Sequence, residues 1–278
     1  MPELPEVSCV IQNLKDEKIC GLKILNVYNT LDKLFKNCSF TQFKDFVIGE
    51  TINDISRIGK YLIFHLSNNK VFVVHLRMEG KLFLDDSTDL YDLSHTLVRI
   101  NFGDKELRYH DTRRFGTFTI YYEDTYQESK EIKKLALDPL QNGFDAQYLK
   151  KKIKKSTRAI KTVLLTQEIV SGIGNIYADE ILYASKIHPE TAANQLSTND
   201  LKQIVNNAKL ILEEAILNKG TTINSYLYKK DHTGGFQKFL KVHQKKGKNC
   251  GVCNSKIIKI KVNGRGTYLC QKCQKIKK

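Results

Sequence analysis

The chain has 278 residues, 41% of them hydrophobic, which predicts more than one folded domain and excludes an intrinsically disordered protein. No apolar run approaches the roughly 20 residues of a membrane-spanning helix and no signal-peptide pattern is present, so we expect a cytoplasmic protein that does not engage a membrane. Forty-five Lys and Arg residues against thirty Asp and Glu residues give a formal net charge of +15, which favours a polyanionic partner. Nucleic acid is the leading candidate, with anionic lipid or a merely solvated surface as alternatives.

The first residues, Met1-Pro2-Glu3, suggest an amine nucleophile. A small residue after Met1 usually permits removal of that methionine, which would leave Pro2 with a free secondary amine whose pKa is roughly 7.7 to 8.0. Such an amine can condense with a sugar aldehyde carbon, and the resulting iminium is cationic without needing a proton. Glu3 stands beside the amine as a candidate proton carrier, and Glu6 lies one helical turn further along.

The same segment predicts an N-terminal helix. Pro5 falls in the first turn, Glu6 suits the positive end of the helix dipole, and Gly21 is the predicted end. Apolar residues at helical spacing are predicted to face a core: Val7, Ile11 and Leu14. The structural and chemical interpretations are compatible, because the helix would fix the terminus that reacts.

Short β-rich runs follow this helix. They cover residues 22–28, 60–66, 71–76, 97–102, 107–110 and 117–122. The turn signals Ser67-Asn68-Asn69 and Gly103-Asp104 each connect two neighbouring runs, which favours hairpins and an antiparallel sandwich over a parallel sheet.

Loops of this β domain carry long side chains that can probe a duplex. His75 and Met78 follow one predicted strand, and Arg113 and Phe115 lie between two others. An enzyme that acts on a base must turn the nucleotide out of the stack, and apolar or planar side chains can fill the gap. In isolation Met78 and Phe115 are more typical of a core, and Lys60, at a strand start, is either a phosphate ligand or an exposed residue.

From about residue 145 the pattern becomes helical. Ser197 and Asp200 form a predicted capping box, and the helix that follows ends by Gly220. Its apolar residues recur at helical spacing: Leu201, Ile204, Val205, Ala208, Ile211, Leu212, Ala215 and Ile216. The lysines at 150–155 are predicted to cover an exposed helix face, and residues 137–143 have the Pro and Gly signals of a linker.

Two glycines, Gly172 and Gly174, stand immediately before another predicted helix that begins with Asn175. N–H groups at a helix start, with the Asn175 amide as a further donor, can hold a phosphate without reading bases. A close turn between two helices is the alternative, because a glycine pair before a helix is a weak motif.

The last forty or so residues contain two Cys-x2-Cys pairs separated by sixteen residues: Cys250, Cys253, Cys270 and Cys273. This spacing presents four thiolates to one tetrahedral Zn²⁺, and four sulfur ligands leave no open position, so we predict a structural zinc ion. The other three cysteines are scattered, which argues against a secreted disulfide framework.

A β-ribbon is predicted between the two cysteine pairs. Its Gly264-Arg265-Gly266 tip can bring a guanidinium and backbone N–H groups close to phosphate. The alternative is a tight turn with a solvated arginine.

These elements predict an α+β multidomain protein. We expect an N-terminal antiparallel β-sandwich with flanking helices at 1–135, a linker at 136–147, a helical DNA-binding domain at 148–235 and a four-cysteine zinc finger with a β-hairpin at 236–278.

In this order, the motifs resemble the formamidopyrimidine-DNA glycosylase family, bacterial enzymes that remove oxidised purines such as 8-oxoguanine. The resemblance spans nearly the whole chain. It rests on Pro-Glu-Leu-Pro-Glu-Val, Lys60, His-Leu-Arg-Met-Glu-Gly, Arg-Arg-Phe-Gly, Gly-Ile-Gly-Asn-Ile-Tyr and the four-cysteine finger with Gly-Arg-Gly. It implies a helix-two-turn-helix in the helical domain, base excision coupled to abasic-site lyase activity, and a monomer that acts on duplex DNA containing oxidised bases or abasic sites.

The resemblance also implies a role for each matching residue. Pro2 is the expected nucleophile at C1′ and Glu3 the acid/base. The remaining expected roles are support by Glu6, phosphate binding and catalysis by Lys60, DNA contact by His75, intercalation by Met78, Arg113 and Phe115, and phosphate contact by Asn175 and Arg265. Arg113 is expected to face the cytosine left opposite the lesion, and residues 222–237 correspond to a loop that closes over the flipped base.

Two other functions stay open. An endonuclease VIII-type enzyme would prefer oxidised pyrimidines, but that group commonly begins Pro-Glu-Gly-Pro-Glu and lacks the Met with Arg-x-Phe set found here. A non-catalytic zinc-ribbon protein would explain the charge, Arg265 and the cysteines, but not the Pro-Glu terminus. Departures from the usual family pattern are mild: Ser8-Cys9 follows the opening motif, and Leu135-Ala136-Leu137-Asp138-Pro139 replaces the more common linker.

Overall fold

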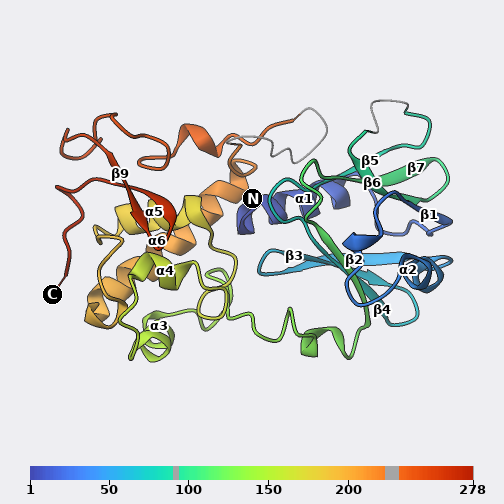
Figure 1. Ribbon diagram of the computed structural model, residues 1–278, viewed down its shortest axis with the longest axis horizontal. Helices are drawn as coiled ribbons and strands as arrows, with labels where there is room; N and C mark the ends of the chain where they lie inside the picture. The colour runs from blue at the N-terminus through green and yellow to red at the C-terminus, as the bar shows by residue number, and fades with distance from the viewer. Residues whose placement is uncertain (90–93, 223–231, 278) are drawn as a thin grey trace. The chain divides into compact units, whose positions relative to one another are not determined.

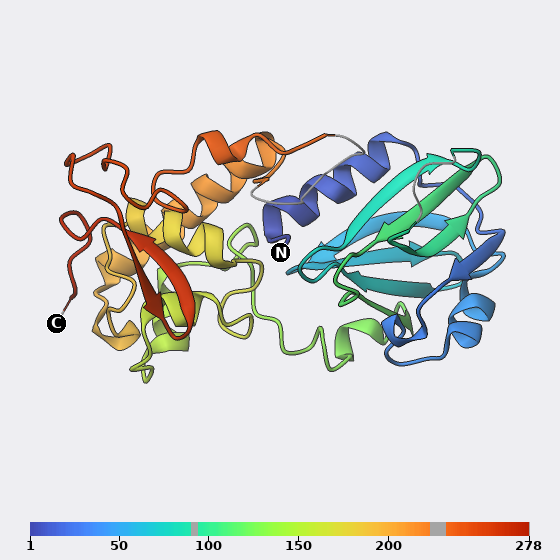
Figure 2. The same ribbon diagram turned by 45° about the horizontal axis from the view of Figure 1, so that its top comes forward.

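A computed structural model describes residues 1–89, 94–222 and 232–277. The chain divides into two compact units, one formed by residues 1–133 and 218–235 and the other by residues 134–217 and 236–278 (Figures 1 and 2). Among the described residues, no helix combines the length and the apolar character that crossing a bilayer requires.

Two four-stranded antiparallel sheets form the first unit, as predicted. One sheet has the strand order β2-β3-β4-β8, and the other has the order β1-β6-β7-β5. The strands are β1 (Asn26–Asn29), β2 (Ile52–Ile58), β3 (Tyr61–Leu66), β4 (Lys70–His75), β5 (Lys81–Asp86), β6 (Thr96–Asn101), β7 (Lys105–His110) and β8 (Thr117–Tyr122). Buried residues from both sheets make one continuous hydrophobic core, so the unit is a β-sandwich.

Two strands were not predicted. The edge strand β2 buries only Ile52 and Ile55 and has an irregular register between Ile52 and Asp54, so its apolar residues do not alternate. Strand β5 buries four consecutive residues and also lacks alternation. Conversely, one predicted strand is shorter than expected, because the run at 22–28 becomes a strand only from Asn26.

The helix α1 (Leu4–Asp16) packs eight buried residues into this unit, with Pro5 in its first turn as predicted. It ends at Asp16, five residues before the predicted end at Gly21. Lys18 takes the left-handed backbone conformation, with φ of 63°, and the Ile19 N–H donates to the Leu14 carbonyl, so the chain turns earlier than the glycine alone indicated.

A second helix of this unit, α2 (Phe40–Val47), was not predicted, although its start signal is in the sequence. The Ser39 hydroxyl accepts from the Gln42 N–H, and the Gln42 side chain accepts from the Ser39 N–H. This is a capping box, Ser-x-x-Gln, at the start of a helix of only eight residues.

The second unit is helical, with a two-stranded ribbon near its C-terminal end (Figure 1). Its elements are α3 (Ala146–Ile153), α4 (Ile160–Leu164), α5 (Asn175–Ala184), α6 (Thr198–Leu217), β9 (Ile258–Val262) and β10 (Arg265–Leu269). Single 3-10 turns occur in both units: η1 (Asp32–Leu34), η2 (Tyr126–Glu128), η3 (Ala193–Gln195) and η4 (Phe236–Lys238). The predicted capping of α6 is confirmed, because the Ser197 hydroxyl accepts from the Asp200 N–H.

The described residues of the segment 218–235, which are 218–222 and 232–235, belong to the first unit, whereas we expected them in the helical domain at 148–235. A hydrogen bond to the rest of the first unit accounts for this difference, because the Thr221 N–H donates to the Glu6 carboxylate at 2.8 Å. Within the segment, the Gly234 N–H donates to the Thr222 hydroxyl at 2.8 Å. The backbone at Gly220 and Gly234 is so close that a Cβ on Gly234 would lie 2.2 Å from the Gly220 carbonyl oxygen. Most of the loop expected at 222–237 lies outside the described residues.

Candidate active site and nucleic-acid interface

The N-terminal residues of α1 form a buried carboxylate site. Glu3 and Glu6 are 3% and 1% exposed, and Pro2 is also buried. One oxygen of Glu6 accepts the Glu3 N–H at 2.8 Å, and the other accepts the Thr221 N–H at 2.8 Å. Glu6 therefore fixes the backbone beside Pro2 and ties it to the segment that follows α6.

Lys60 and His75 lie close together at one end of the first sheet. Lys60 occupies the turn before β3, and its neighbour Tyr61 pairs in register with His75 at the end of β4. The Tyr61 and His75 rings make an edge-to-face contact with centroids 4.5 Å apart. Lys60 is 5% exposed, so it is not the solvated surface lysine that the sequence left as an alternative.

His75 is held as a neutral imidazole. Its Nδ1 accepts the Arg77 N–H at 2.9 Å, which leaves the proton on Nε2 as a donor. Burial, followed by the positive charges of Arg77 and Lys60, lowers the pKa of His75 to about 3. A neutral donor with its other nitrogen occupied suits contact with a phosphate oxygen near pH 7.

This pKa predicts an acid sensitivity of the first unit. The pKa of His75 is about 6.5 in the unfolded chain and about 3 in the folded protein. Protonation below pH 6.5 therefore favours the unfolded chain, so the stability that neutral His75 allows is complete above pH 7 and is lost as the pH falls from 6.5 toward 3. Between pH 7 and 4.5 the loss should be on the order of 2 to 3 kcal/mol. The free energy of unfolding, measured with urea, should therefore fall less between pH 7 and 4.5 in His75→Gln than in wild type, and the difference should be about that amount. An equal pH effect in both proteins would contradict the assignment.

The two loops expected to probe DNA present exposed side chains. Met78 is 43% exposed, Phe115 is 51% exposed and Arg113 is also exposed, so none of them is a core residue. The Arg113 guanidinium lies over the Phe115 ring, 5.0 Å from its centroid. Exposed large apolar side chains on otherwise polar loops are typical of surfaces that bind a partner.

The backbone of both loops is unusual. Arg77 and Arg114 have left-handed backbone conformations, with φ of 55° and 59°. Loop 111–116 is organised by one buried carboxylate, because Asp111 accepts the N–H groups of Arg113, Phe115 and Gly116 at 2.8 to 3.0 Å. Sequence reasoning did not single out Asp111. An Asp at the end of a strand and two residues before an arginine pair is too common a pattern to signal this function.

In the second unit, Asn175 is the first residue of α5, after Gly174. Its side-chain amide donates to the Gly266 carbonyl at 3.1 Å, which joins the start of α5 to strand β10 of the ribbon. An amide nitrogen carries two hydrogens, so the second can donate to a phosphate. The positive end of the helix dipole lies at the same place.

Arg265 is exposed and begins β10, where it pairs with Val262. The two-residue turn of the ribbon is Asn263-Gly264, with φ of 45° and 75°, rather than the predicted Gly-Arg-Gly tip. The difference arises because both turn positions require positive φ, which asparagine and glycine adopt readily and arginine does not. Arg265 directly follows the turn as the first residue of β10.

A buried ionic network, which no sequence pattern predicted, fixes the ribbon against the helices of the second unit. Lys161 Nζ donates to Asp179 Oδ1 at 2.7 Å and to the Thr267 hydroxyl at 2.8 Å, and Lys161 and Asp179 have fully buried side chains. His243 Nδ1 lies 2.7 Å from the second Asp179 oxygen. Lys161 follows the lysine-rich stretch and resembles its surface neighbours in sequence, although it sets the position of the segment that carries Arg265.

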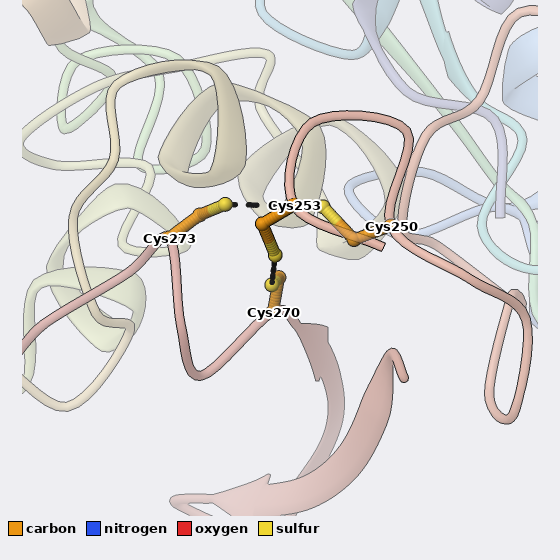
Figure 3. A group of neighbouring side chains, drawn as sticks. All are labelled: Cys250, Cys253, Cys270 and Cys273. Atoms are coloured by element: carbon orange, nitrogen blue, oxygen red, sulfur yellow. Dashed lines mark hydrogen bonds between the residues drawn. The ribbon is translucent and has the colours of Figure 1, made fainter. Parts of the chain in front are cut away.

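The four cysteines form a metal site. Figure 3 shows their sulfur atoms turned toward one another from the two loops at the end of the ribbon. All four sulfur atoms lie within 4.8 Å of one another, with Cys253 and Cys270 at 3.3 Å and Cys250 and Cys273 at 3.8 Å. Tetrahedral Zn–S bonds of about 2.3 Å place sulfur atoms roughly 3.8 Å apart, so this set fits one zinc ion. Four thiolates close its coordination, and the ion is structural.

The first unit is a β-sandwich with buried Glu3 and Glu6 at its N-terminus, and the second is a helical unit with a four-cysteine finger. This combination is typical of zinc-containing proteins that process DNA. Residues 1–118 match the N-terminal domain of formamidopyrimidine-DNA glycosylase, residues 135–226 its H2TH domain, and residues 247–276 a zinc finger found in FPG and IleRS. The chain belongs to the formamidopyrimidine-DNA glycosylase family.

Curated and solved relatives agree with this assignment. The formamidopyrimidine-DNA glycosylase of Mycoplasma pneumoniae is 50% identical over 275 residues, with 99% of each chain covered, and that of Listeria innocua is 41% identical over 276 residues, covering 99% of this chain and 100% of the other. A crystal structure of Lactococcus lactis Fpg with DNA containing N7-benzyl-Fapy-dG has a TM-score of 0.92 at 39% identity, and covers 98% of this chain and 99% of the other. A complex of the same enzyme with abasic-site DNA has a TM-score of 0.91 at 38% identity over the same shares.

Proposed function

We propose that this protein is a bifunctional DNA glycosylase and abasic-site lyase that excises oxidised purines, 8-oxoguanine and formamidopyrimidines, from duplex DNA. The observation that carries the proposal is the buried Pro2-Glu3 pair at the start of α1, whose backbone is fixed by Glu6. Family membership over the whole chain supports the same reaction class.

The Pro2 nitrogen, freed by removal of Met1, is the nucleophile. Its lone pair attacks C1′ of the flipped nucleotide, the glycosidic bond breaks and the base leaves with a proton supplied by Glu3. The proton lost from the Pro2 nitrogen goes to the ring oxygen as the bond between C1′ and O4′ breaks, and an iminium forms between Pro2 and C1′. Glu3, now a carboxylate, assists removal of a C2′ proton, and successive β and δ eliminations release the 3′ and 5′ phosphates.

Lys60 and His75 suit the phosphate next to the lesion. Both are buried at the same end of one sheet, and Lys60 supplies a positive charge while His75 supplies a neutral Nε2–H donor. Such groups hold the backbone of the flipped nucleotide so that C1′ stays near the amine, which converts attack into an effectively intramolecular step.

Met78, Arg113 and Phe115 fill the space that the flipped nucleotide leaves. The apolar side chains of Met78 and Phe115 are already exposed, so inserting them between bases removes apolar surface from water. Arg113 has donors for the acceptor groups of the cytosine that remains opposite the lesion. This assignment supports a preference for lesions opposite cytosine.

Asn175 and Arg265 contact phosphates from the second unit. Arg265→Ala should weaken binding to damaged and undamaged duplex by similar factors and should lower the slope of log affinity against log salt by about 1. Fluorescence anisotropy over a salt series measures both quantities. Lys272→Ala, an exposed lysine of the same finger outside the ribbon, is the matched control. An unchanged slope in Arg265→Ala would contradict a phosphate contact.

The central experiment combines cleavage with borohydride trapping. Wild-type protein should cut an 8-oxoguanine:cytosine duplex on both sides of the lesion, and borohydride should link protein and DNA covalently. A non-catalytic binder would shift the duplex without cutting it. Competition between 8-oxoguanine and thymine glycol duplexes decides between purine and pyrimidine preference. This comparison is necessary because one solved relative is a Lactococcus lactis Fpg complex with oxidised-pyrimidine DNA.

We place this activity in the cytoplasm, because its substrate is chromosomal DNA, and we propose that the protein acts as a monomer.

A further inference from the structure

One phenolic hydroxyl lies between the two DNA-probing loops. Tyr109, near the end of β7, is 1% exposed, and its hydroxyl donates to Asp111 Oδ2 at 2.9 Å. The same carboxylate oxygen accepts the N–H groups of Phe115 and Gly116 at 2.8 and 2.9 Å. The hydroxyl is therefore bonded to the group that shapes the loop carrying Arg113 and Phe115.

The same hydroxyl also adjoins the other loop. A Cβ atom on Gly80 would lie 2.7 Å from the Tyr109 oxygen, and one on Gly116 would lie 1.7 Å from it. Gly80 closes the turn that carries Met78, since its N–H donates to the Leu76 carbonyl at 3.0 Å. The two loops thus approach Tyr109 through glycines, and any side chain at either position would collide with the phenol.

The hydroxyl keeps its proton at neutral pH and well above it. Burial, followed by the Asp111 charge, raises the pKa of Tyr109 far above its ordinary value. A protonated phenol at this position donates to a carboxylate that is itself 1% exposed. A buried bond of this kind is hard to exchange for water, which makes it suited to fixing a distance.

We propose that Tyr109, held by Asp111, is a positioning residue that fixes the Met78 loop relative to the Arg113 and Phe115 loop, so that both enter the duplex together and Arg113 meets the opposite base in one orientation. This inference rests on the proposed function. It assigns opposite-base specificity to a residue that touches neither base. Core packing alone would require the aromatic ring, which contacts Phe118 at 5.2 Å between centroids, but not the hydroxyl.

The test is Tyr109→Phe, which keeps the ring and removes the hydroxyl. Excision of 8-oxoguanine opposite cytosine should fall roughly tenfold, whereas excision opposite adenine should change less than about twofold, so the ratio of the two kcat/KM values should fall roughly tenfold. Borohydride trapping on a preformed abasic duplex should stay within about twofold of wild type, because the Pro2 amine is untouched.

The matched control is Tyr126→Phe, since Tyr126 is a buried tyrosine of the same unit, 6% exposed, that lies in η2 outside both loops, and its hydroxyl accepts the Gln127 side-chain amide at 3.3 Å. It should change neither the ratio nor the trapping. The proposal is overturned if Tyr109→Phe leaves the cytosine-to-adenine ratio within about twofold of wild type, whether the two rates are both normal or both reduced in parallel. A wild-type protein that cuts no 8-oxoguanine duplex would instead overturn the proposed function, so the two failures are distinguishable.

Discussion

Keeping the Pro2 nitrogen in an amide bond should abolish base excision and strand cleavage while leaving DNA binding intact. Insertion of one lysine between Met1 and Pro2 retains the methionine, because the residue after it is no longer small, and leaves every residue from Pro2 onward unchanged. An amide nitrogen shares its lone pair with the carbonyl and cannot attack C1′. We expect cleavage of an 8-oxoguanine duplex to fall by about 10⁴-fold or more and borohydride trapping to disappear.

Two controls separate chemistry from folding. Pro5→Ala changes the proline in the first turn of α1, whose nitrogen is never free, and should keep trapping. Intact mass reports whether Met1 is present in each protein, and anisotropy with a tetrahydrofuran abasic analogue reports binding. If the inserted variant, with Met1 shown to be retained, still traps and cuts DNA like wild type, Pro2 is not the nucleophile and Glu3 loses its proposed role.

Much of this site could be predicted from the sequence because the patterns that indicate it involve residues close together in the chain. The cysteine spacing, the glycine pair before Asn175 and the capping of α6 each depend on neighbouring residues, and the structure has all three features. The residues that support the site depend instead on distant partners. Lys161 meets Asp179, which is 18 residues away, and Thr267, which is 106 residues away, and Glu6 meets Thr221 across 215 residues of chain.

The errors have physical causes of the same kind. Strand β2 lacks alternation because it lies at a sheet edge with an irregular register, and α2 is shorter than the windows in which helical periodicity emerges. The Arg265 turn differs by one residue because positive φ decides the turn position. None of these errors concerns the residues proposed for the reaction. Those residues lie at the ends of elements that the sequence did predict, such as α1, β3 and β4.

Removing the zinc ion should cost DNA affinity without unfolding the first unit. The finger has a thin core, made of Tyr183, Val242, Cys250, Ile257 and Cys270, so two of its five buried members are themselves metal ligands. Such a core cannot stabilise a fold alone, and structural zinc binding contributes roughly 10 to 16 kcal/mol in small fingers. Loss of zinc should release the ribbon that carries Arg265 and weaken binding to an abasic-analogue duplex by about 10²-fold or more.

The comparison uses Cys270→Ala, which removes a ligand, and Cys20→Ala, which removes a half-buried thiol of the first unit that is not a ligand. Native mass spectrometry should find one zinc ion per chain in wild type and Cys20→Ala and none in Cys270→Ala. The hydrophobic core of the first unit contains no residue of the finger, so its unfolding transition should persist in Cys270→Ala. A zinc-free Cys270→Ala protein that binds the abasic analogue with wild-type affinity would show that the ribbon is not a phosphate-binding element. Arg265 would then be an exposed residue of a purely structural hairpin.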